Sequence, residues 1–367
     1  MSAASKSEAL KFKDKLYTLE TAMNEERMVE VFAPLMREYW GEAWRVQEVR
    51  IEVMRRRNQR CVLRYRVHGV DAETGERLEW RVVGKVFKAD RGEPVYENMR
   101  RLWEYGFRRE AQDHISIPEP LAFSSNMCML FQEEVGGVPV KNILRQAPQP
   151  EHMRQVARTI AKLHQSPLVP GKPFTVKEHL TRCHPRHEFL TLAAPNLAGT
   201  VEALINGAHE VEKSFGNYRK TTLHGDFHLG QIHVDGENVW LIDFDALSYG
   251  DPASDLGNLL VFLKGKIKRQ PEMRELIDVF LDEYFSVMDP AIAHRIPLHE
   301  GLTHLRRACK CLRMQEEGWE RRVKRMVEMG LACINEMRTT IITPDSAFFK
   351  SGYDDDEVED LELAEAE

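Results

Sequence analysis

The feature that most constrains the fold is a β-hairpin inside an acid-rich segment, residues 223–257, with the sequence LHGDFHLGQIHVDGENVWLIDFDALSYGDPASDLG. Asp235-Gly236 is a pair typical of two-residue hairpin turns, and it separates two short runs in which apolar and polar residues alternate. Because a hairpin folds the chain back on itself, Asp226 before the first strand is expected to lie near Asp243 after the second. The sequence therefore predicts two carboxylates at one end of a small ribbon.

Two converging carboxylates suit phosphoryl transfer to a hydroxyl group. One carboxylate can hold a divalent cation, while the other orients and deprotonates the attacking hydroxyl. This transfer is accelerated mainly through positioning and electrostatic stabilisation, with magnesium, a lysine and a base supplied by different elements. A hydrolase with paired acids would not need the lysine-bearing strand that lies upstream in this chain.

The apolar pattern changes twice along the chain. Residues 8 to about 40 show helical spacing. From Val46 the period is two, which predicts three strands in an antiparallel meander, then a helix that ends near Gly106 and two further strands. Beyond the Gly-Gly turn of EVGGVPV, nearly every apolar pattern has helical spacing. The predicted domains are a helical extension at 1–45, a strand-rich N-lobe at 46–135, a helical C-lobe at 136–345 and an acidic disordered tail at 351–367.

Length and composition are those of an ordinary globular protein. The chain has 367 residues, of which 43% are hydrophobic and 30% charged, enough for two lobes. No run of about 18 apolar residues appears, and the start lacks the apolar centre of a secretory signal. Six cysteines without the regular spacing of a disulfide scaffold fit a reducing compartment. We therefore expect a cytoplasmic protein without a membrane partner.

The formal charge of −7 is concentrated at the C-terminus, because residues 351–367 hold nine acids and no base. Such a block is typical of a disordered, solubilising tail, with docking or autoinhibition as the alternative. The rest of the chain is slightly basic on balance, and its arginine-rich late helices mix acids with bases. We therefore expect no nucleic-acid partner, and the oligomeric state is left open.

Three motifs, HGDFHLGQ, IDFD and GDPASDLG, follow one another within residues 224–257. In order and spacing they resemble the aminoglycoside phosphotransferase and choline kinase superfamily, whose pattern is H-G-D-x-x-x-x-N, then [ILV]-D-[FW]-[DE], then D-P-x-x-D-L. The His-Leu-Gly-Gln ending of the first motif is most similar to the maltokinase-like branch. The resemblance covers about residues 46–340. It implies an α+β, two-lobed, protein-kinase-like fold, with a small antiparallel-sheet N-lobe that binds the nucleotide and a mainly helical C-lobe that binds the acceptor.

The resemblance assigns roles to three residues of these motifs. Asp226 would be the catalytic base that accepts the proton of the acceptor hydroxyl, and Asp243 the main ligand of Mg²⁺. Gln231 stands where the wider superfamily has an asparagine that binds a second metal ion. The amide oxygen is retained one methylene further out, which leaves open whether one or two metal ions bind.

Other motif residues are expected to support this site. His224 resembles a residue that fixes the catalytic loop, and Asp255 resembles the buried acid that braces it. Asp245 is expected to touch the metal or a water bound to it. His228 faces the acceptor side, where it either contacts the acceptor or packs the loop. Asp251 is as consistent with a turn residue as with a ligand.

The nucleotide side requires a lysine on the third strand and a glutamate on the next helix. Lys85 in RVVGKVFK alternates with Val83 and Phe87 and so falls on the inward face, where an unpaired ammonium would be costly. Glu97 is the preferred partner and Glu93 the second choice. The alternative for Glu97 is a solvated acid on a helix surface.

The adenine ring is expected between the two lobes, against the backbone of LFQEEVGG. The residues predicted to line it are Gln132, Glu133 and Val135. Between the first two strands, where protein kinases have a Gly-rich cover over the phosphates, this chain has RRRNQR. Arg55, Arg56 or Arg57 would approach the phosphates there, or the turn is simply solvated.

A competing metal site is suggested by the spacing of His179, Cys183 and His187, which recur at intervals of four. Pro185 interrupts any helix that would align them, so polar packing is the default. His164 matches a Leu-His pair that ends a helix in the superfamily, and a packed, hydrogen-bonded histidine is expected there.

The resemblance implies a small-molecule kinase that depends on ATP and Mg²⁺ and transfers the γ-phosphate to a hydroxyl group. A sugar is the first expectation for the acceptor, and an aminoglycoside or amino alcohol the next. One alternative is an ATP-binding pseudokinase or scaffold protein, against which the joint presence of Lys85, Asp226 and Asp243 argues. The other is a protein or peptide kinase, against which the missing Gly-rich loop argues.

Overall fold

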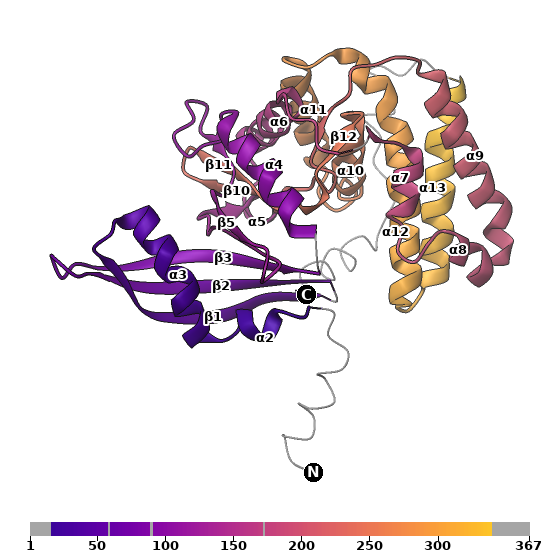
Figure 1. Ribbon diagram of the computed structural model, residues 1–367. Helices are drawn as coiled ribbons and strands as arrows, with labels where there is room; N and C mark the ends of the chain where they lie inside the picture. The colour runs from indigo at the N-terminus through magenta and orange to yellow at the C-terminus, as the bar shows by residue number, and fades with distance from the viewer. Residues whose placement is uncertain (1–15, 58, 89–90, 172, 340–367) are drawn as a thin grey trace, which may run out of the picture. The chain divides into compact units, whose positions relative to one another are not determined.

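The computed structural model describes residues 16–57, 59–88, 91–171 and 173–339 of the chain (Figure 1). They divide into two compact units, of which unit 1 is Met1–Gly137 with Asp235–Asp245 and unit 2 is Val138–Val234 with Ala246–Glu367. The chain therefore leaves unit 1 after Gly137 and returns to it once. Residues 8–15 of the predicted helical start and the acidic tail at 351–367 lie outside the described residues, and the predicted domain boundaries stay predictions.

Unit 1 is built on a five-stranded sheet of order β1-β2-β3-β6-β5. The strands are β1 (Trp44–Arg57), β2 (Arg60–Asp71), β3 (Arg77–Phe87), β5 (Pro120–Ser124) and β6 (Met129–Glu133). Every neighbouring pair is antiparallel, so the predicted meander and the antiparallel-sheet N-lobe are confirmed. Buried side chains alternate with partly exposed ones along β2, as expected for a strand with one face on a core.

One face of this sheet is covered by helix α3 (Glu25–Trp40), which lies across β1 to β3 (Figure 1). Tyr65 lies opposite Val82 in the β2–β3 register and packs against Phe32 of α3, with ring centroids 5.2 Å apart. Successive side chains of a strand point to opposite faces. Lys85, three residues beyond Val82, therefore extends from the face that α3 does not cover.

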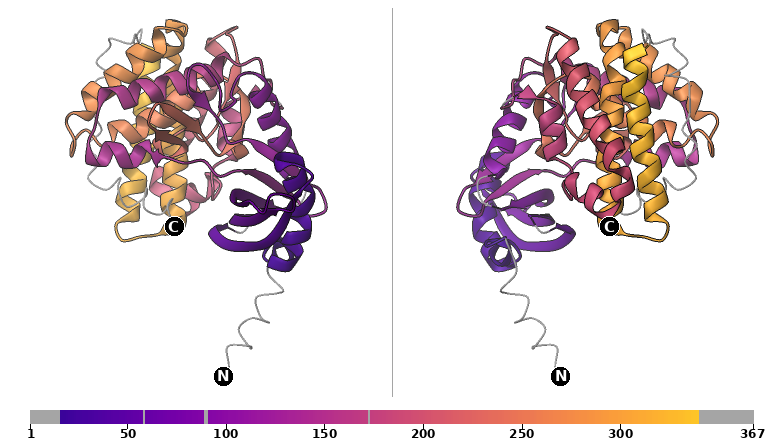
Figure 2. Two further views of the ribbon diagram at one scale, coloured as in Figure 1. Left: turned by 90° about the vertical axis from the view of Figure 1, so that its left-hand side faces the viewer. Right: turned by 90° about the vertical axis from the view of Figure 1, so that its right-hand side faces the viewer.

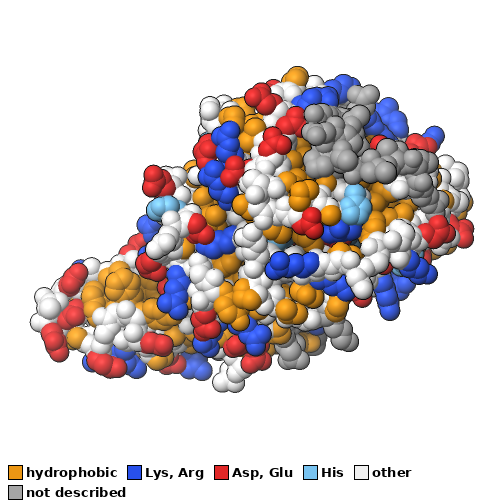
Figure 3. Space-filling view, turned by 90° about the horizontal axis from the view of Figure 1, so that it is seen from above, with side chains coloured by type: hydrophobic (Ala, Val, Ile, Leu, Met, Phe, Trp, Pro, Cys, Tyr) orange, Lys and Arg blue, Asp and Glu red, His pale blue; other side chains and the backbone are white. Residues whose placement is uncertain are grey.

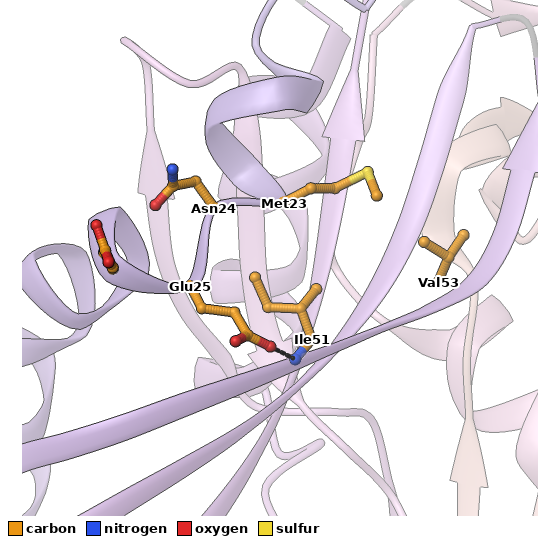
Figure 4. Close-up of a pocket in the computed structure, with 6 residues that line it drawn as sticks. Met23, Asn24, Glu25, Ile51 and Val53 are labelled. Carbon is orange, nitrogen blue, oxygen red and sulfur yellow. Dashed lines mark hydrogen bonds between the residues drawn. The ribbon is translucent and has the colours of Figure 1, made fainter. Parts of the chain in front are cut away.

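Two side chains at the start of α3 accept backbone hydrogen bonds, one within the helix and one from β1. Asn24 accepts a hydrogen bond from the Arg27 amide at 2.9 Å and so caps the helix. The Glu25 carboxylate accepts one from the Ile51 amide at 3.2 Å, beside a shallow hollow of about 440 Å³ (Figure 4). The short helix α2 (Leu19–Ala22) precedes this joint, and its buried side chains complete the same core.

Helix α4 (Gly92–Glu104) follows β3 in unit 1. A Cβ atom at Gly92 would lie 2.7 Å from the ring of Phe87 and 2.8 Å from that of Phe123, so only glycine permits this close approach. Phe87 and Lys85 are two residues apart on β3 and share a face. The unit is completed by β4 (Ile115–Ser116), which pairs in parallel with the returning strand β11 (Asn238–Leu241).

Unit 2 is mainly helical, as predicted for the C-lobe. Its helices are α5 (Val140–Gln146), α6 (Pro150–Gln165), α7 (Val176–Thr181), α8 (Glu188–Ala193), α9 (Ala198–Ser214), α10 (Ala253–Lys264), α11 (Met273–Phe285), α12 (Ile296–Met314) and α13 (Trp319–Thr339). Helices α9, α12 and α13 run side by side (Figure 2) and share one core that includes Leu204, Leu305 and Val327. None of the described helices is long and apolar enough to cross a lipid bilayer.

Short strands in unit 2 shape the acid-rich segment. They are β7 (Val138–Pro139), β8 (Pro173–Phe174), β9 (Thr221–Leu223), β10 (Ile232–Asp235) and β12 (Ser248–Gly250). The predicted hairpin turn is present at Gly236 and Glu237, between β10 and β11. Strand β12 pairs antiparallel with β9, with Ser248 opposite Leu223, so the chain after the hairpin returns beside the strand that precedes HGDFHLGQ.

The surface carries charges of both signs. On the face drawn in Figure 3, lysine and arginine side chains are interspersed with aspartate and glutamate. Binding to a nucleic-acid backbone depends on a concentrated positive patch. The mixed face gives no support to such a partner, and its absence stays a prediction.

Candidate active site

The best-formed polar cluster of unit 1 joins two cations to two carboxylates. The Lys85 ammonium, 5% exposed, lies 2.9 Å from Asp243 Oδ1 and 3.1 Å from Asp245 Oδ1. The Arg60 guanidinium donates to the same Asp243 Oδ1 at 2.8 Å and also contacts Asp245. We call these four residues the charge cluster. They come from β2, β3 and the turn after β11, which the sheet of unit 1 and the β4–β11 pair hold in place.

Lys85 and Asp243 keep their charges in the folded protein. Burial alone would raise the pKa of Asp243, yet Lys85 and Arg60 hold that pKa well below its usual value. Burial likewise opposes the charged form of Lys85, but Asp243 and Asp245 raise its pKa above the ordinary value. A carboxylate and an ammonium that remain ionised are suited to hold a metal cation and a phosphate group.

Asp243 also has an unusual backbone. Its φ angle is +68°, in the left-handed region that non-glycine residues seldom adopt, although aspartate is among the more tolerant. Backbone strain of this kind concentrates at functional sites, where the surrounding contacts hold it. The conformation turns the chain sharply at the end of β11 and directs the Asp243 carboxylate to Lys85.

Asp226 belongs to unit 2, in the loop after β9, and its side chain is 50% exposed. An accessible carboxylate suits a base that must reach an incoming hydroxyl. Arg306 of α12 lies close to it, with Nη1 3.8 Å from Asp226 Oδ1. Because Asp226 and Asp243 fall in different units, their approach around the hairpin stays a prediction.

Asp255 holds the backbone of the loop that carries Asp226. This carboxylate, 1% exposed, accepts hydrogen bonds from the backbone amides of His224 at 2.7 Å and Gly225 at 2.8 Å. His164 lies 3.2 Å away through Nε2, and its Nδ1 lies 2.8 Å from the Tyr284 hydroxyl. Burial would raise the pKa of Asp255, but these partners lower it, so the carboxylate stays ionised in a closed network. The geometry is that of a brace for the loop.

Position 225 requires glycine. Its φ angle is +80°, and a Cβ atom there would lie 2.2 Å from the carbonyl oxygen of Ala246. Gly225→Ala is therefore expected to destabilise the protein by about 2 kcal/mol or more, through backbone strain and a contact that rigid backbone cannot relieve. Urea unfolding of the two proteins measures the difference. Gly199→Ala is the control, because Gly199 lies in helix α9 with open space around it and is expected to be neutral or stabilising.

His228 and Gln231 contact each other within the same loop. The Gly230 amide donates to His228 Nδ1 at 3.0 Å, and His228 Nε2 lies 3.2 Å from the side-chain amide nitrogen of Gln231. Because the Gly230 amide donates to Nδ1, that nitrogen is the acceptor of the ring. Of the two predicted uses of His228, these contacts favour packing of the loop.

Basic side chains that the sequence did not single out surround this loop in unit 2. Arg182 donates to the carbonyl oxygens of Gly225 at 2.7 Å and Ala246 at 3.1 Å. Burial, helped by the nearby charge of Arg306, lowers the pKa of Arg182 to about 10. Arg306 also contacts Asn258, whose amide donates to the Phe227 carbonyl at 2.9 Å. The helical spacing of α12 predicts a helix but does not reveal which arginine turns to the loop.

The predicted partner of Lys85 differs from the observed ones. Glu97 and Glu93 are exposed on α4, and an ion pair with Lys85 is not formed by either of these described residues. Asp243 and Asp245 take that place. The alternative given for Glu97, a solvated acid on a helix surface, describes its position here.

The residues predicted to line adenine lie on β6 and just beyond it. Gln132 is 5% exposed and sits opposite Val83, on the sheet face of Lys85. In the described part of the chain its side-chain Oε1 has no hydrogen-bond partner. The Glu133 amide donates to Glu119 at 2.9 Å and is thus used within the sheet, while Val135 is half-buried after the strand.

The competing metal site is replaced by polar packing. His179 Nε2 lies 3.0 Å from the Ser254 hydroxyl and 3.2 Å from His299 Nδ1, while His187 pairs with Glu188. Among the described residues no group of three or more histidine, cysteine, aspartate or glutamate side chains is arranged to hold a metal ion. Mg²⁺ often takes one or two carboxylates and completes its shell with phosphate oxygens, and Asp243 with Asp245 fits that requirement.

Asp251 is a structural acid. Arg295 donates to it twice, at 2.7 and 3.2 Å, and His299 Nε2 lies 3.6 Å away. Burial would raise its pKa, but His299 and Arg295 lower it to about 2. Asp251 Oδ1 also accepts a hydrogen bond from the Ala253 amide at 3.1 Å, so of its two predicted uses, turn residue and ligand, the contacts favour the turn residue. The ion pair with Arg295 ties this turn at the start of α10 to the segment before α12.

This lowered pKa predicts a pH dependence of stability. Because the pKa of Asp251 is lower in the folded protein than its ordinary value of about 4, the ionised carboxylate stabilises the folded state fully above about pH 4. This contribution of about 2 kcal/mol to the free energy of unfolding is lost as the pH falls to about 2. Asp251→Asn should therefore be less stable than the wild type at pH 7, and the difference should shrink on acidification. Urea unfolding between pH 2 and 7 tests this, with Asp282→Asn, an exposed acid on α11, as the control.

Several solved structures share this architecture, which is the protein-kinase-like fold. A choline/ethanolamine kinase family protein from Mesorhizobium loti aligns at a TM-score of 0.54 and 16% identity, over 78% of this chain and 92% of that one. A spectinomycin phosphotransferase bound to ADP and spectinomycin aligns at 0.51 and 12%, over 86% and 99%. An amicoumacin kinase bound to AMP-PNP and Ca²⁺ aligns at 0.52 and 15%, over 89% and 97%.

Family membership follows from the sequence match. Residues 64–291, more than half of the chain, match the model of the phosphotransferase enzyme family, so the chain belongs to that family. No curated protein matches the chain. The family supports the coarser prediction of a small-molecule phosphotransferase and leaves the acceptor open.

Proposed function

We propose that the protein is an ATP- and Mg²⁺-dependent kinase that transfers the γ-phosphate to a hydroxyl group of a small molecule. The observation that carries the proposal is the charge cluster, in which Lys85 and Asp243 stay ionised at 2.9 Å from each other. A phosphotransferase needs both charges close together, one for the nucleotide and one for the metal. Membership of the phosphotransferase enzyme family supports the same reaction.

The residues present fit a nucleotide. Lys85 and the orphaned Oε1 of Gln132 lie on one face of the sheet of unit 1, so a cation for phosphates and an acceptor for an amino group are offered on the same side. Asp243 and Asp245 would hold Mg²⁺, with Gln231 as a further oxygen donor. When bound, Mg²⁺ neutralises phosphate charge and lowers the barrier to transfer.

The proposed role of Asp226 is to accept the hydroxyl proton of the acceptor. Asp255 holds the backbone on the N-terminal side of Asp226, and Asn258 holds the carbonyl of Phe227 on the other side. The carboxylate itself is half exposed, so it can meet a hydroxyl without a further rearrangement of the loop.

For the acceptor we propose a sugar first, as the His-Leu-Gly-Gln ending and its similarity to the maltokinase-like branch suggest. Arg306 and Arg182 place positive charge around the Asp226 loop. Such charge repels a polycation, so a neutral sugar is favoured over an aminoglycoside, and an amino alcohol carries less of the same penalty. Spectinomycin is bound in one structural neighbour, and it is not carried over to this chain.

The test is acceptor-dependent release of ADP from the purified protein with ATP and Mg²⁺. The panel contains neutral sugars, amino alcohols and aminoglycosides, and each is compared between wild type and Asp226→Ala. Turnover that needs a sugar and disappears in the variant supports the proposal. Binding of ATP without transfer to any acceptor would favour the ATP-binding scaffold, and transfer to a peptide would favour a protein kinase.

A further inference from the structure

Arg60 is the member of the charge cluster that no motif predicts. It is the first residue of β2 and lies opposite Phe87 of β3, which is two residues from Lys85. Residues that lie opposite each other on paired strands share a face, and so do residues two apart on one strand. Arg60 and Lys85 therefore extend from neighbouring strands to the same side of the sheet, where Arg60 remains only 17% exposed at its side chain.

The two cations compete for the same acceptor. Asp243 Oδ1 receives the Lys85 ammonium at 2.9 Å and the Arg60 guanidinium at 2.8 Å, while Asp245 contacts both cations as well. Two cations that share one oxygen repel each other. Asp245 offers separate oxygens, Oδ1 to Lys85 and Oδ2 to Arg60, so two cations balance two carboxylates and an added metal cation would leave the cluster positively charged.

The same carboxylates are the proposed ligands of Mg²⁺. A divalent cation bound to Asp243 and Asp245 would be repelled by Lys85 and Arg60 if both stayed in their present contacts. A triphosphate supplies the anionic oxygens that the two cations need once the carboxylates turn to the metal. A guanidinium is well suited to this exchange, because its planar fork matches carboxylate and phosphate equally.

We propose that Arg60 is a phosphate-binding residue that exchanges partners, contacting Asp243 and Asp245 in the free protein and the nucleotide triphosphate in the complex. This inference rests on the proposed function, and it gives Arg60 the place that backbone amides of a Gly-rich loop take in protein kinases. Arg60 opens β2 directly after the connection from β1, the position of the Gly-rich loop in protein kinases. In the free protein, Arg60 also shields the carboxylates from metal ions that arrive without nucleotide.

The proposal predicts that loss of Arg60 changes two affinities in opposite directions, and the experiment measures both. Binding of ATP, ADP and adenosine without divalent ions is measured by calorimetry, and binding of Mn²⁺ without nucleotide by electron paramagnetic resonance. Arg60→Gln is expected to weaken ATP and ADP binding roughly tenfold to a hundredfold, the effect of a lost charge-assisted contact, and to leave adenosine within about twofold. The same change is expected to strengthen Mn²⁺ binding, because one competing cation is gone.

Arg66→Gln is the matched control, since Arg66 lies on the same strand and the same face but is exposed. Arg60→Lys keeps the charge without the fork and should fall between wild type and Arg60→Gln, which covers the case in which the larger change disturbs folding. Loss of ATP and Mn²⁺ affinity together, or an unchanged ratio of ATP to adenosine affinity, would overturn the assignment. If Arg60→Gln weakens ATP binding and strengthens Mn²⁺ binding, but the wild type phosphorylates no acceptor, the role of Arg60 is upheld and the proposed function is refuted. If the wild type binds no nucleotide, both are refuted.

Discussion

Asp226→Asn is expected to lower the rate of acceptor phosphorylation by roughly a hundredfold to ten-thousandfold, the range that a positioned general base contributes. Asparagine keeps the size of the side chain but cannot accept the hydroxyl proton. The loop around it should persist, because Asp255 and Asn258 hold the neighbouring backbone rather than the Asp226 carboxylate. Steady-state kinetics should therefore show a fall in kcat, and calorimetry should show nucleotide affinity within about twofold of the wild type.

The control for this prediction is Asp235→Asn, an exposed acid at the end of β10 in the same segment. It should retain full activity, since its side chain has no proposed role in the transfer. Equal losses in the two variants would mean that the segment as a whole, and not the Asp226 carboxylate, had been disturbed. A variant Asp226→Asn that keeps near-normal kcat would remove the residue from the role of base.

The second large effect is expected at Asp243. Asp243→Asn leaves Lys85 and Arg60 with Asp245 as their one remaining carboxylate in the charge cluster, and an uncompensated buried cation destabilises a protein strongly. Because Asp243 is about one-fifth exposed, we expect a loss of about 2–4 kcal/mol in the free energy of unfolding. Removal of the proposed metal ligand should also abolish measurable Mg²⁺-dependent transfer.

A double-mutant cycle separates these effects. Lys85→Met with Asp243→Asn removes both charges, so the double variant should be more stable than the sum of the single losses predicts, with a coupling of about 1–3 kcal/mol. Urea unfolding in the absence of nucleotide measures all four proteins. Strict additivity would show that the contact of 2.9 Å contributes no interaction energy, and the central evidence for the proposed function would then be weakened.

Part of this architecture was predictable because it is encoded in short stretches. The period of two from Val46 predicts the antiparallel meander, and the switch to helical spacing after EVGGVPV predicts the helical lobe; both are present. Alternation in RVVGKVFK predicts that Lys85 points inward, and it is buried. These features depend on neighbours within a few residues, so local sequence fixes them.

Glu97 shows where such reasoning fails. A helical acid after the lysine strand fits the family pattern, but whether it reaches the lysine depends on how α4 is rotated and placed on the sheet. Here the rotation leaves Glu97 exposed, and Asp243 and Asp245, which follow β11, form the ion pairs with Lys85. If a helix rotates about its axis by one residue position, each side chain moves to another face. The sequence of the helix alone does not set this rotation.

The sequence by itself determined the hairpin, the order of the three motifs and the inward lysine, because turn chemistry and strand alternation act over a few residues. Only the tertiary structure decided that Arg60 joins Lys85 on Asp243 and that Arg306 lies beside Asp226. The first depends on the register between β2 and β3, and the second on the packing of α12 in unit 2. Both are long-range arrangements in which many weak contacts, and no single motif, select the residue that arrives at the site.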